Sequence, residues 1–333
     1  MSEQKVRWGV ISTANIGRRA ILPAIRRSHN GVLVAVGSRD LAKARAFAHE
    51  LDIPRAYGSY EEVLNDPEVE AIYIPLPNSL HREWAIRAAE AGKHVLCEKP
   101  LGLDAAECFQ MEVAARAHDV LLMEAFMYRF HPQTARVREL IAAGTIGKPQ
   151  LIRASFSFRL TNPANIRLNP ELGGGSLMDV GCYCVNVART LFQSEPTEAQ
   201  ASAEWSASGV DELMVGSMRF PGGRWAQFDC ALTIARREAY QVIGDEGYID
   251  VPIAFLPGTV DTQFRIHDKQ GLRVETIDGV DEYQLMVEHF ADCVRNGNRP
   301  RYSAGEAAAN MRAIAALYQS ARNGGRLEVV ASQ

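Results

Sequence analysis

The sequence predicts two domains of different architecture. In the first 125 residues, short apolar runs of strand length alternate with helix-length segments of 3.6-residue periodicity. This alternation indicates parallel βαβ units and therefore a doubly wound α/β domain. From residue 198 onward, several strand-like runs follow one another, which predicts a large, mostly antiparallel open sheet. We therefore expect an N-terminal α/β domain over residues 1–125 and a C-terminal α+β domain over residues 126–333.

The composition excludes several classes of protein. The chain has 333 residues, a formal net charge of -4 and no strongly basic block, which argues against nucleic acid or an anionic membrane as the main partner. The polar N-terminus runs directly into a strand, and no apolar run approaches the roughly 20 residues that cross a bilayer. The six cysteines are scattered, which favours reduced, structural thiols over a metal site. We expect a cytoplasmic protein without a metal.

The elements of the first domain follow from the alternation. Strands are expected over residues 6–12, 32–38, 71–76, 95–97 and 120–125. Helices are expected over residues 17–27, 40–51, 61–65, 80–91 and 105–117. Asp40 and Asp104 are expected to cap the helices that follow them, with Glu107 completing a capping box. Asn78 or Ser79 is expected to cap the helix that starts at residue 80.

The turn after the first strand stands where a dinucleotide-binding (Rossmann) domain carries G-x-G-x-x-G. The third glycine, Gly17, is present. Small residues replace the other two, and they still let the backbone approach a pyrophosphate at the helix N-terminus. The residues of this turn expected at the cofactor are Ser12, Thr13, Ala14, Asn15 and Ile16.

The end of the second strand predicts which dinucleotide binds. An NAD site usually places an acidic residue there for the ribose 2′-hydroxyl, whereas this chain has Ser38 and Arg39, with Lys43 one turn later. A guanidinium can pair with a 2′-phosphate and lie on the adenine face. We therefore expect NADP rather than NAD. The alternative is that Arg39 and Lys43 form an ordinary solvated face.

The loops after the third and fourth strands supply further candidates. Leu76, Pro77 and Asn78 form a stiff loop expected to contact the cofactor. His81 follows on the first turn of the next helix, where it either faces the cofactor or serves the helix end.

The fourth strand is followed by two charges and a proline, Glu98-Lys99-Pro100. Charges at the carboxyl end of a central parallel strand point toward the ligand. The proline restricts Lys99 to an extended backbone, so its side chain is aimed. The alternative is a surface salt bridge at a strand end.

The second half has its own order of elements. An amphipathic helix is expected over residues 132–143, a strand over 150–159, a loop rich in Asn, Pro and Gly over 160–175, and a buried helix over 176–192. The strands of the large sheet are expected over residues 198–205, 213–220, 225–234, 239–243 and 248–251, with a hairpin turn at 221–223. Helices over residues 284–296 and 305–322 end the chain.

Taken together, these motifs resemble the glucose–fructose oxidoreductase / inositol dehydrogenase / MocA (Gfo/Idh/MocA) family. The resemblance covers nearly the whole chain and rests on the Glu-Lys-Pro triplet, the degenerate glycine turn, and residues 75–81, 91–94 and 173–183. Residues 123–130 and the Asp-x-x-x-Tyr form of the second-half motif are similar to the dimeric dihydrodiol dehydrogenase and D-xylose dehydrogenase branch. Many other members carry Asp-x-x-x-His, and this chain departs from them at Tyr183.

The resemblance implies an active site and an assembly. Asp179 and Tyr183, four residues apart and thus on one helix face, would face the nicotinamide and Lys99. Arg129 and Arg167 would approach the cofactor. The last helices would pack back on the first domain, and the open face of the C-terminal sheet would bind another subunit, giving a homodimer or homotetramer.

The chemistry expected is hydride transfer between a nicotinamide and a carbon that bears a hydroxyl. Tyr183 would be the general acid/base, and the Lys99 ammonium would favour its phenolate and hold the substrate oxygen; the two roles could be exchanged. Asp179 would bind a neighbouring substrate hydroxyl or orient Lys99, and Glu98 would anchor the strand end or the nicotinamide ribose. The alternative for Tyr183 is a half-buried tyrosine of a structural helix.

The candidate substrate residues suit a neutral sugar or polyol, which needs many polar partners. They are Lys99, Arg129, His131, Asn162, Asn165, Arg167, Asp179 and Tyr183. We expect oxidation of a cyclic aldose such as D-xylose or D-glucose to its lactone, with an aromatic trans-dihydrodiol second and a 3-keto sugar reductase third. A non-catalytic NADP-binding regulator is the alternative of a different class.

Overall fold

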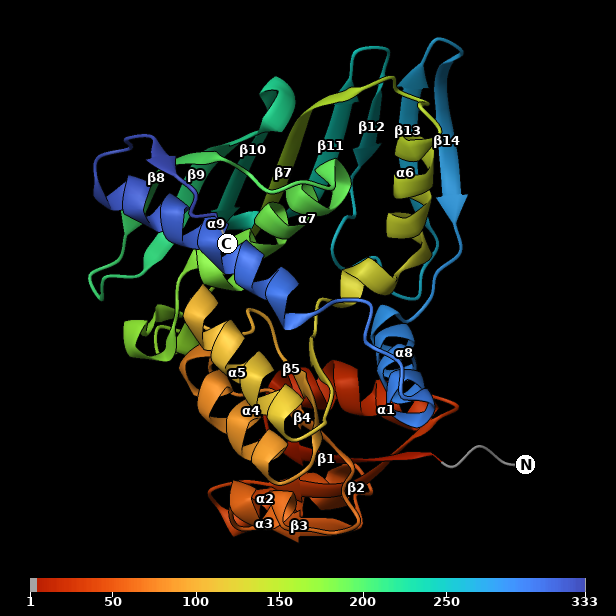
Figure 1. Ribbon diagram of the computed structural model, residues 1–333, viewed down its shortest axis with the longest axis vertical. Helices are drawn as coiled ribbons and strands as arrows, with labels where there is room; N and C mark the ends of the chain where they lie inside the picture. The colour runs from red at the N-terminus through yellow and green to blue at the C-terminus, as the bar shows by residue number, and fades with distance from the viewer. Residues whose placement is uncertain (1–4, 333) are drawn as a thin grey trace. The chain divides into compact units, whose positions relative to one another are not determined.

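The computed structural model describes residues 5–332, which divide into two compact units (Figure 1). The first unit ends at Met127 and also contains Asp281–Ala308. The second unit contains Tyr128–Val280 and the chain from Ala309 onward. The sequence places the boundary between the domains after residue 125. In the structure the first unit extends two residues further, to Met127, and it also includes the later segment Asp281–Ala308.

The first unit is built on a six-stranded parallel sheet of order β3-β2-β1-β4-β5-β6. Its strands are β1 (Val6–Ile11), β2 (Gly31–Gly37), β3 (Arg55–Tyr57), β4 (Ala71–Ile74), β5 (His94–Cys97) and β6 (Leu122–Glu124). The central strands are almost entirely buried, as expected when helices cover both faces of a parallel sheet. The predicted doubly wound domain is therefore confirmed. The short edge strand β3 was not predicted, because its three residues are half-buried and carry no apolar run.

Helices connect these strands. They are α1 (Leu22–Arg27), α2 (Leu41–Glu50), α3 (Tyr60–Leu64), α4 (His81–Glu90), α5 (Ala105–Ala117) and, from the returning segment, α8 (Glu282–Asn296). α8 belongs to the core of this unit, because the buried rings of Trp8 in β1 and Phe290 in α8 lie with their centroids 5.6 Å apart.

The helix caps predicted from the sequence are confirmed in part. Asp40 caps α2 and Asp104 caps α5, as predicted. The predicted capping box of α5 is wrong, because the Glu107 carboxylate accepts a hydrogen bond from the Leu103 N–H instead of that of Asp104. The predicted cap of α4 by Asn78 or Ser79 is also wrong: a 3₁₀ turn precedes α4, and no side chain caps the helix.

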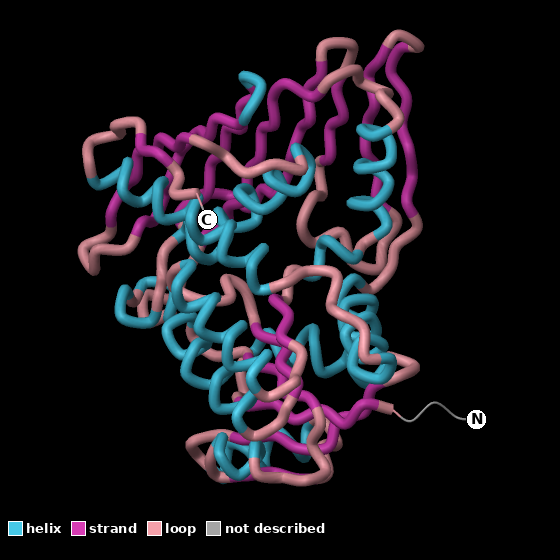
Figure 2. The backbone as a smooth tube through the Cα atoms, viewed as in Figure 1, coloured by secondary structure: helices cyan, strands magenta, loops and turns pink. Residues whose placement is uncertain are grey.

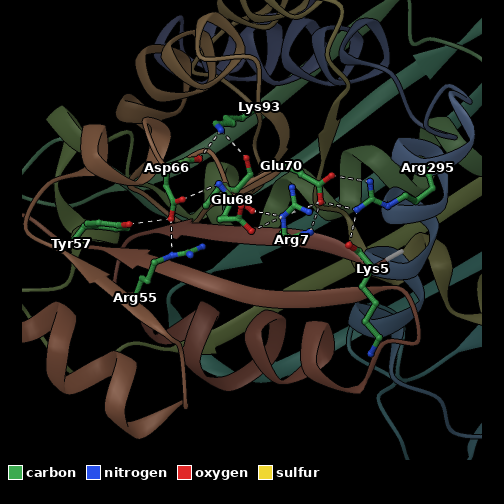
Figure 3. Close-up of polar contacts among 10 residues, drawn as sticks. Lys5, Arg7, Arg55, Tyr57, Asp66, Glu68, Glu70, Lys93 and Arg295 are labelled. Atoms are coloured by element: carbon green, nitrogen blue, oxygen red, sulfur yellow. Dashed lines mark hydrogen bonds and ion pairs between the residues drawn. The ribbon is translucent and has the colours of Figure 1, made fainter. Parts of the chain in front are cut away.

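Charged side chains tie together the amino ends of the parallel strands (Figure 3). The Glu70 carboxylate, just before β4, accepts hydrogen bonds from the Arg7 N–H at 2.9 Å and from the Arg295 guanidinium at 2.7 and 2.9 Å. Lys93, just before β5, donates to the backbone carbonyls of Asp66 and Val69. This network joins β1, β4 and α8 at the end of the sheet opposite to the predicted cofactor loops.

Glu70→Gln should destabilise the first unit by about 1–3 kcal/mol at pH 7, because it weakens charge-assisted hydrogen bonds. Burial raises the pKa of Glu70, but the hydrogen bonds from Arg295 and Arg7 outweigh it and leave the pKa lowered. A depressed carboxyl pKa stabilises the fold above the unfolded-state value, about 4.3, and that stabilisation is lost as the pH falls through the folded-state value. Denaturant unfolding should therefore show a difference in the free energy of unfolding between wild type and Glu70→Gln. This difference should be full at pH 7 and shrink below about pH 4.

The matched control is Glu68→Gln, whose carboxylate is exposed and lies 3.7 Å from the Arg7 guanidinium. An exposed pair of this kind contributes about 0.5 kcal/mol or less. Equal losses in the two variants would contradict the role assigned to Glu70.

The second unit is built on a nine-stranded sheet of order β14-β13-β12-β11-β7-β10-β9-β8-β15. Its strands are β7 (Pro149–Arg159), β8 (Glu198–Trp205), β9 (Asp211–Phe220), β10 (Arg224–Ala231), β11 (Thr233–Gly244), β12 (Tyr248–Val251), β13 (Thr262–Asp268), β14 (Gly271–Ile277) and β15 (Glu328–Val329). Among its neighbouring strands β7 and β10 are parallel and the other pairs antiparallel. The mostly antiparallel sheet is thus confirmed.

Two details of this sheet differ from the prediction. The strand expected over residues 225–234 ends at Ala231, and the chain turns at Leu232 into the long strand β11. Strands β13, β14 and the two-residue β15 were not predicted. β14 alternates half-buried and exposed residues, so it lacks the apolar run that marks a buried strand.

Helices of the second unit cover one face of its sheet (Figure 2). They are α6 (Pro132–Ala142), α7 (Cys182–Phe192) and the later turns of α9 (Ala304–Arg322). A π-helical turn, Leu177–Gly181, leads directly into α7, which packs on β7 and β10. No helix within residues 5–332 is both long and apolar enough to cross a membrane. All six cysteines are buried free thiols.

Candidate active site

The predicted cofactor residues of the first unit lie on loops at the carboxyl ends of four adjacent strands, β2, β1, β4 and β5. The strand order reverses direction between β1 and β4, and this switch point is where open parallel sheets bind dinucleotides. The fold therefore places the turn after β1 where the cofactor phosphates of such domains lie.

The turn after β1 is accessible. Asn15 and Ile16 are exposed, and Thr13 and Ala14 are half-buried. The Ser12 hydroxyl accepts a hydrogen bond from the Ala14 N–H, which closes the turn. The helix that follows begins with a π-helical turn, Gly17–Ile21.

Gly17, at the start of the following helix, faces the interior of the unit. A Cβ there would lie 3.2 Å from the side chain of buried Leu22, so glycine permits close packing at this point. The exposed turn before it fits a bound pyrophosphate, which needs close backbone approach at a helix N-terminus.

The end of β2 presents Arg39. Ser38 is buried, and its hydroxyl accepts a hydrogen bond from the N–H of Asp40, while Arg39 and Lys43 are exposed. Burial raises the pKa of Tyr60, and the Arg39 guanidinium beside its hydroxyl opposes that rise. Arg39 is therefore held at the strand end with part of its charge beside a phenol. Lys43 lies 3.8 Å from the Asp40 carboxylate.

The segment after β5 carries the predicted catalytic Lys99, which is half-buried. On one side of it, Glu98 accepts a hydrogen bond of 2.7 Å from the hydroxyl of Tyr73, a fully buried residue of β4. Burial and the Glu98 carboxylate raise the pKa of Tyr73, so its hydroxyl remains a donor. Glu98 thus anchors the strand end, one of its two expected roles.

On the other side of Lys99, two buried side chains bind the backbone. A ring nitrogen of His81 lies 2.9 Å from the Pro100 carbonyl, and the Leu101 N–H donates to the Glu124 carboxylate at 2.7 Å. With Glu98 held by Tyr73, the backbone on both sides of Lys99 is fixed by side chains from other elements.

The structure gives His81 a structural role, and its predicted contact with the cofactor stays a prediction. His81 has no exposed surface, and its second ring nitrogen lies 2.9 Å from the Leu76 carbonyl. Its ring joins the loop after β4 to the loop after β5. Burial lowers the pKa of His81; the neighbouring Lys99 charge lowers it further, against the carbonyls of Pro100 and Leu76.

The remaining candidates of that loop are more accessible. Leu76 is 7% exposed, and Pro77 and Asn78 are half-buried. Their place after β4, beside the switch point, suits a cofactor contact, which stays a prediction.

In the second unit, Asp179 binds Arg167. The Arg167 Nε donates to the Asp179 carboxylate at 2.6 Å, and the guanidinium lies over the Phe158 ring, 5.8 Å from its centroid. The pair joins the loop expected near the cofactor to the helix expected to carry the chemistry. The sequence suggested Lys99 or a substrate hydroxyl as the partner of Asp179, and it did not foresee Arg167.

Tyr183 lies in an aromatic cluster. Its ring centroid is 5.8 Å from Tyr128, 5.3 Å from Phe156 and 5.4 Å from Phe255, and the residue is 5% exposed. Edge-to-face and tilted contacts of this kind hold a ring in one orientation. The π-helical turn before α7 takes more residues per turn than 3.6, so Asp179 and Tyr183 remain about one turn apart on the same side.

Other predicted substrate residues have structural partners. His131 is 1% exposed, and its Nδ1 accepts a hydrogen bond from the Gln133 N–H, which caps α6. His131 thus has a structural role, and its direct contact with the substrate stays a prediction. Arg129 is 8% exposed, and Asn165 uses its side-chain oxygen to accept from the Arg167 N–H. Asn162 is exposed in the same loop.

Sequence reasoning missed the residues that hold the candidates in place. Tyr73, Glu124 and Asp211 are buried polar residues of strands or strand ends, and each binds a segment at least 23 residues away. No local pattern marks them, apart from the rarity of a charged residue in a strand-like run. Within residues 5–332, no group of three His, Cys, Asp or Glu side chains is placed to hold a metal ion.

Comparison with known proteins identifies relatives along the whole chain. The model of the "Oxidoreductase family, NAD-binding Rossmann fold" matches residues 6–126, and that of the "GFO/IDH/MocA C-terminal domain" matches residues 134–250. The chain is 40% identical to D-xylose 1-dehydrogenase (NADP(+)) 2 of Haloferax volcanii, over 97% of this chain and 99% of that one. It is 37% identical to trans-1,2-dihydrobenzene-1,2-diol dehydrogenase of Danio rerio, over 79% and 81%.

Among solved structures, a 3-ketoreductase from Actinomadura kijaniata, in complex with NADP and TDP-benzene, is similar with a TM-score of 0.91 and 28% identity. The match covers 95% of this chain and 98% of that one.

Proposed function

Because this chain belongs to the Gfo/Idh/MocA oxidoreductase family, we propose that it oxidises a cyclic aldose, D-xylose or D-glucose, to its lactone with NADP. It is an enzyme of the NAD(P)-dependent dehydrogenase class that acts on CH–OH groups. The observation that carries the choice of substrate is the near full-length likeness to a D-xylose 1-dehydrogenase.

The cofactor is NADP, and the residues of the first unit fit it. The accessible turn over residues 12–16 suits the pyrophosphate. Exposed Arg39, at the end of β2, suits the 2′-phosphate, and no acidic side chain takes the place that the ribose hydroxyl of NAD would need. Asp40, the next residue, is used as the N-cap of α2.

A bound nicotinamide would supply the hydride acceptor for oxidation at the anomeric carbon of the sugar, whose C–O bond would become the carbonyl of the lactone. The hydroxyl proton passes to the phenolate of Tyr183 as general base, with the Lys99 ammonium holding the same oxygen; the two residues could exchange roles. The Arg167–Asp179 pair positions the neighbouring sugar hydroxyls.

Two other substrates and one other class remain as alternatives. An aromatic trans-dihydrodiol is favoured by the likeness to the Danio rerio enzyme. A 3-keto sugar would be reduced by the same residues in reverse; the structural relative is named a 3-ketoreductase. A non-catalytic NADP-binding regulator would bind the cofactor without turnover; the presence of both Lys99 and Tyr183 argues against it.

Absorbance at 340 nm should rise when the protein is mixed with NADP and D-xylose or D-glucose. The same assay with a trans-dihydrodiol, and its reverse with NADPH and a 3-keto sugar, ranks the alternatives. Tight NADP binding without turnover on any of them would favour the regulator.

Lys99→Met should abolish turnover and leave the Kd for NADP within about tenfold, because Lys99 acts on the substrate oxygen.

The control is Lys269→Met, at an exposed lysine paired with Glu246 in the second unit, which should keep full activity. Loss of NADP binding in Lys99→Met would make Lys99 a cofactor anchor rather than a catalytic residue.

Arg39→Ala should weaken NADP binding by about tenfold to a hundredfold and change NAD binding little, because one charge-assisted phosphate contact is worth about 1.5–3 kcal/mol. The measurement is the Kd of each cofactor by fluorescence titration. Arg45→Ala is the control, since Arg45 is an exposed arginine of α2, the helix that follows Arg39. Equal losses for NADP and NAD would refute the 2′-phosphate role.

We also propose that the chain assembles as a homodimer or homotetramer through the uncovered face of the second sheet. α7 packs on one face of β7 and β10. The opposite face has a shallow depression of about 460 Å³ lined by Arg153, Ser155, Val215, Asp229 and Asp250, among others. Side chains of both charges line it, and an interface between two copies of one chain must be complementary to itself.

Val215→Arg should shift the protein toward monomer in analytical ultracentrifugation, because it adds a charge at a half-exposed valine on this face. Val113→Arg, at an exposed valine of α5, should leave the mass unchanged. A wild-type mass of one chain would refute the proposal.

A further inference from the structure

A buried carboxylate receives three hydrogen bonds in the second unit. Asp211, the first residue of β9, is 1% exposed. One of its oxygens accepts from the Ser176 hydroxyl at 2.6 Å and from the Leu177 N–H at 2.7 Å. The other oxygen accepts from the Tyr318 hydroxyl of α9 at 2.7 Å. All three donors are neutral.

Two of these bonds end on the start of the helix that carries Asp179 and Tyr183. The first N–H groups of a helix have no partner inside it and are usually bound by the side chain of the N-cap residue. Here the N-cap residue, Ser176, makes no such bond. Asp211 takes its place from 34 residues away along the chain and also accepts from the Ser176 hydroxyl. A negative charge at this end is favourable to the helix dipole.

The fit around the carboxylate is close. Gly175 has a φ of +122°, and a Cβ there would lie 2.1 Å from an Asp211 oxygen and 2.8 Å from the Tyr318 hydroxyl. The Gly175 carbonyl accepts from the Asp179 N–H at 3.0 Å, and its N–H donates to the Arg167 carbonyl at 2.9 Å. Gly175, which lies beside the Asp211 carboxylate, is thus hydrogen-bonded through its backbone to both members of the Arg167–Asp179 pair.

We propose that Asp211 is a positioning residue, which fixes the first turn of the helix that presents Asp179 and Tyr183 and, through Gly175, the loop that presents Arg167. The proposal rests on the proposed function for these three residues. Asp211 acts through the helix and does not touch the substrate.

The cost of burying this charge supports a specific role. Burial raises the pKa of Asp211, and the hydrogen bonds from Ser176, Tyr318 and Leu177 lower it by less, so the net pKa is raised. The structure therefore holds the carboxylate at some expense in stability. An apolar residue would avoid that expense but would leave the Leu177 N–H and the Ser176 hydroxyl buried without their acceptor.

The test compares Asp211→Ala with Asp211→Asn. Alanine removes every acceptor, whereas asparagine keeps one oxygen for Ser176 and Leu177 and can donate to Tyr318, whose hydroxyl accepts as well as donates. Ser320→Ala is the control for general destabilisation, since Ser320 is a fully buried hydroxyl of α9 bonded to the Ala201 N–H in the same unit. Measured quantities are kcat, the Kd for NADP, Tm, and hydrogen exchange of residues 176–183.

We expect Asp211→Ala to lower kcat at least tenfold, to leave the Kd for NADP within about twofold, and to speed exchange of residues 176–183 at least tenfold. Asp211→Asn should recover most of the kcat. Ser320→Ala should lower Tm without lowering kcat. If Asp211→Ala does not fold, Ser176→Ala replaces it and should lower kcat about threefold or more with the same change in exchange.

Three outcomes would overturn the proposal: a kcat of the alanine variant within threefold of wild type, unchanged exchange over residues 176–183, or an equal loss of kcat in Ser320→Ala. Failure of the proposed function is a separate outcome. A wild-type protein that turns over none of the substrates above would refute that function, while the exchange measurement, which needs no substrate, would still decide whether Asp211 fixes the helix.

Discussion

The backbone around Lys99 is the part of the first unit on which the proposed chemistry depends, and buried hydrogen bonds hold it. Tyr73 donates to Glu98, the His81 ring contacts the Pro100 carbonyl, and Glu124 accepts from the Leu101 N–H. These partners come from β4, α4 and β6. A polar group buried without a partner costs about 1–3 kcal/mol, so each of these contacts is lost only at a cost, and the segment has one favoured position.

The second unit uses the same physical means for a different element. Asp211 binds the start of the helix with Asp179 and Tyr183, while aromatic rings surround the tyrosine itself. In both units a residue proposed for chemistry is held by side chains that are not themselves proposed for chemistry. Catalytic groups need this support, because a displacement of about 1 Å can cost two orders of magnitude in rate.

The relatives are named for different reactions: a D-xylose 1-dehydrogenase, a trans-1,2-dihydrobenzene-1,2-diol dehydrogenase and a 3-ketoreductase. Each substrate proposed for this chain presents a carbon that exchanges a hydride and an oxygen that exchanges a proton. The proposed roles of Lys99 and Tyr183 would serve any of them, so the proposal leaves the choice among these substrates to the loops around the two residues. In this chain the loop over residues 160–175 carries three of the candidate substrate residues, Asn162, Asn165 and Arg167. The Arg167 side chain is bound to Asp179.

The sequence by itself determined the order of the helices and of the buried strands, because burial on both faces leaves continuous apolar runs and amphipathic helices leave a 3.6-residue period. It also located Asp40 and Asp104 as caps, since such a cap binds an N–H two or three residues away. It did not reveal β14, in which half-buried and exposed residues alternate, or the structural partners of His81 and His131.

Only the tertiary structure decided which side chains hold the proposed site. The partners of Glu98, Leu101, Asp179 and Leu177 lie 12 to 34 residues away along the chain. A hydrogen bond acts over about 3 Å, and periodicity describes only neighbours within a few residues. Which distant donor meets which acceptor is therefore fixed when the strands and helices pack, and no local pattern records it.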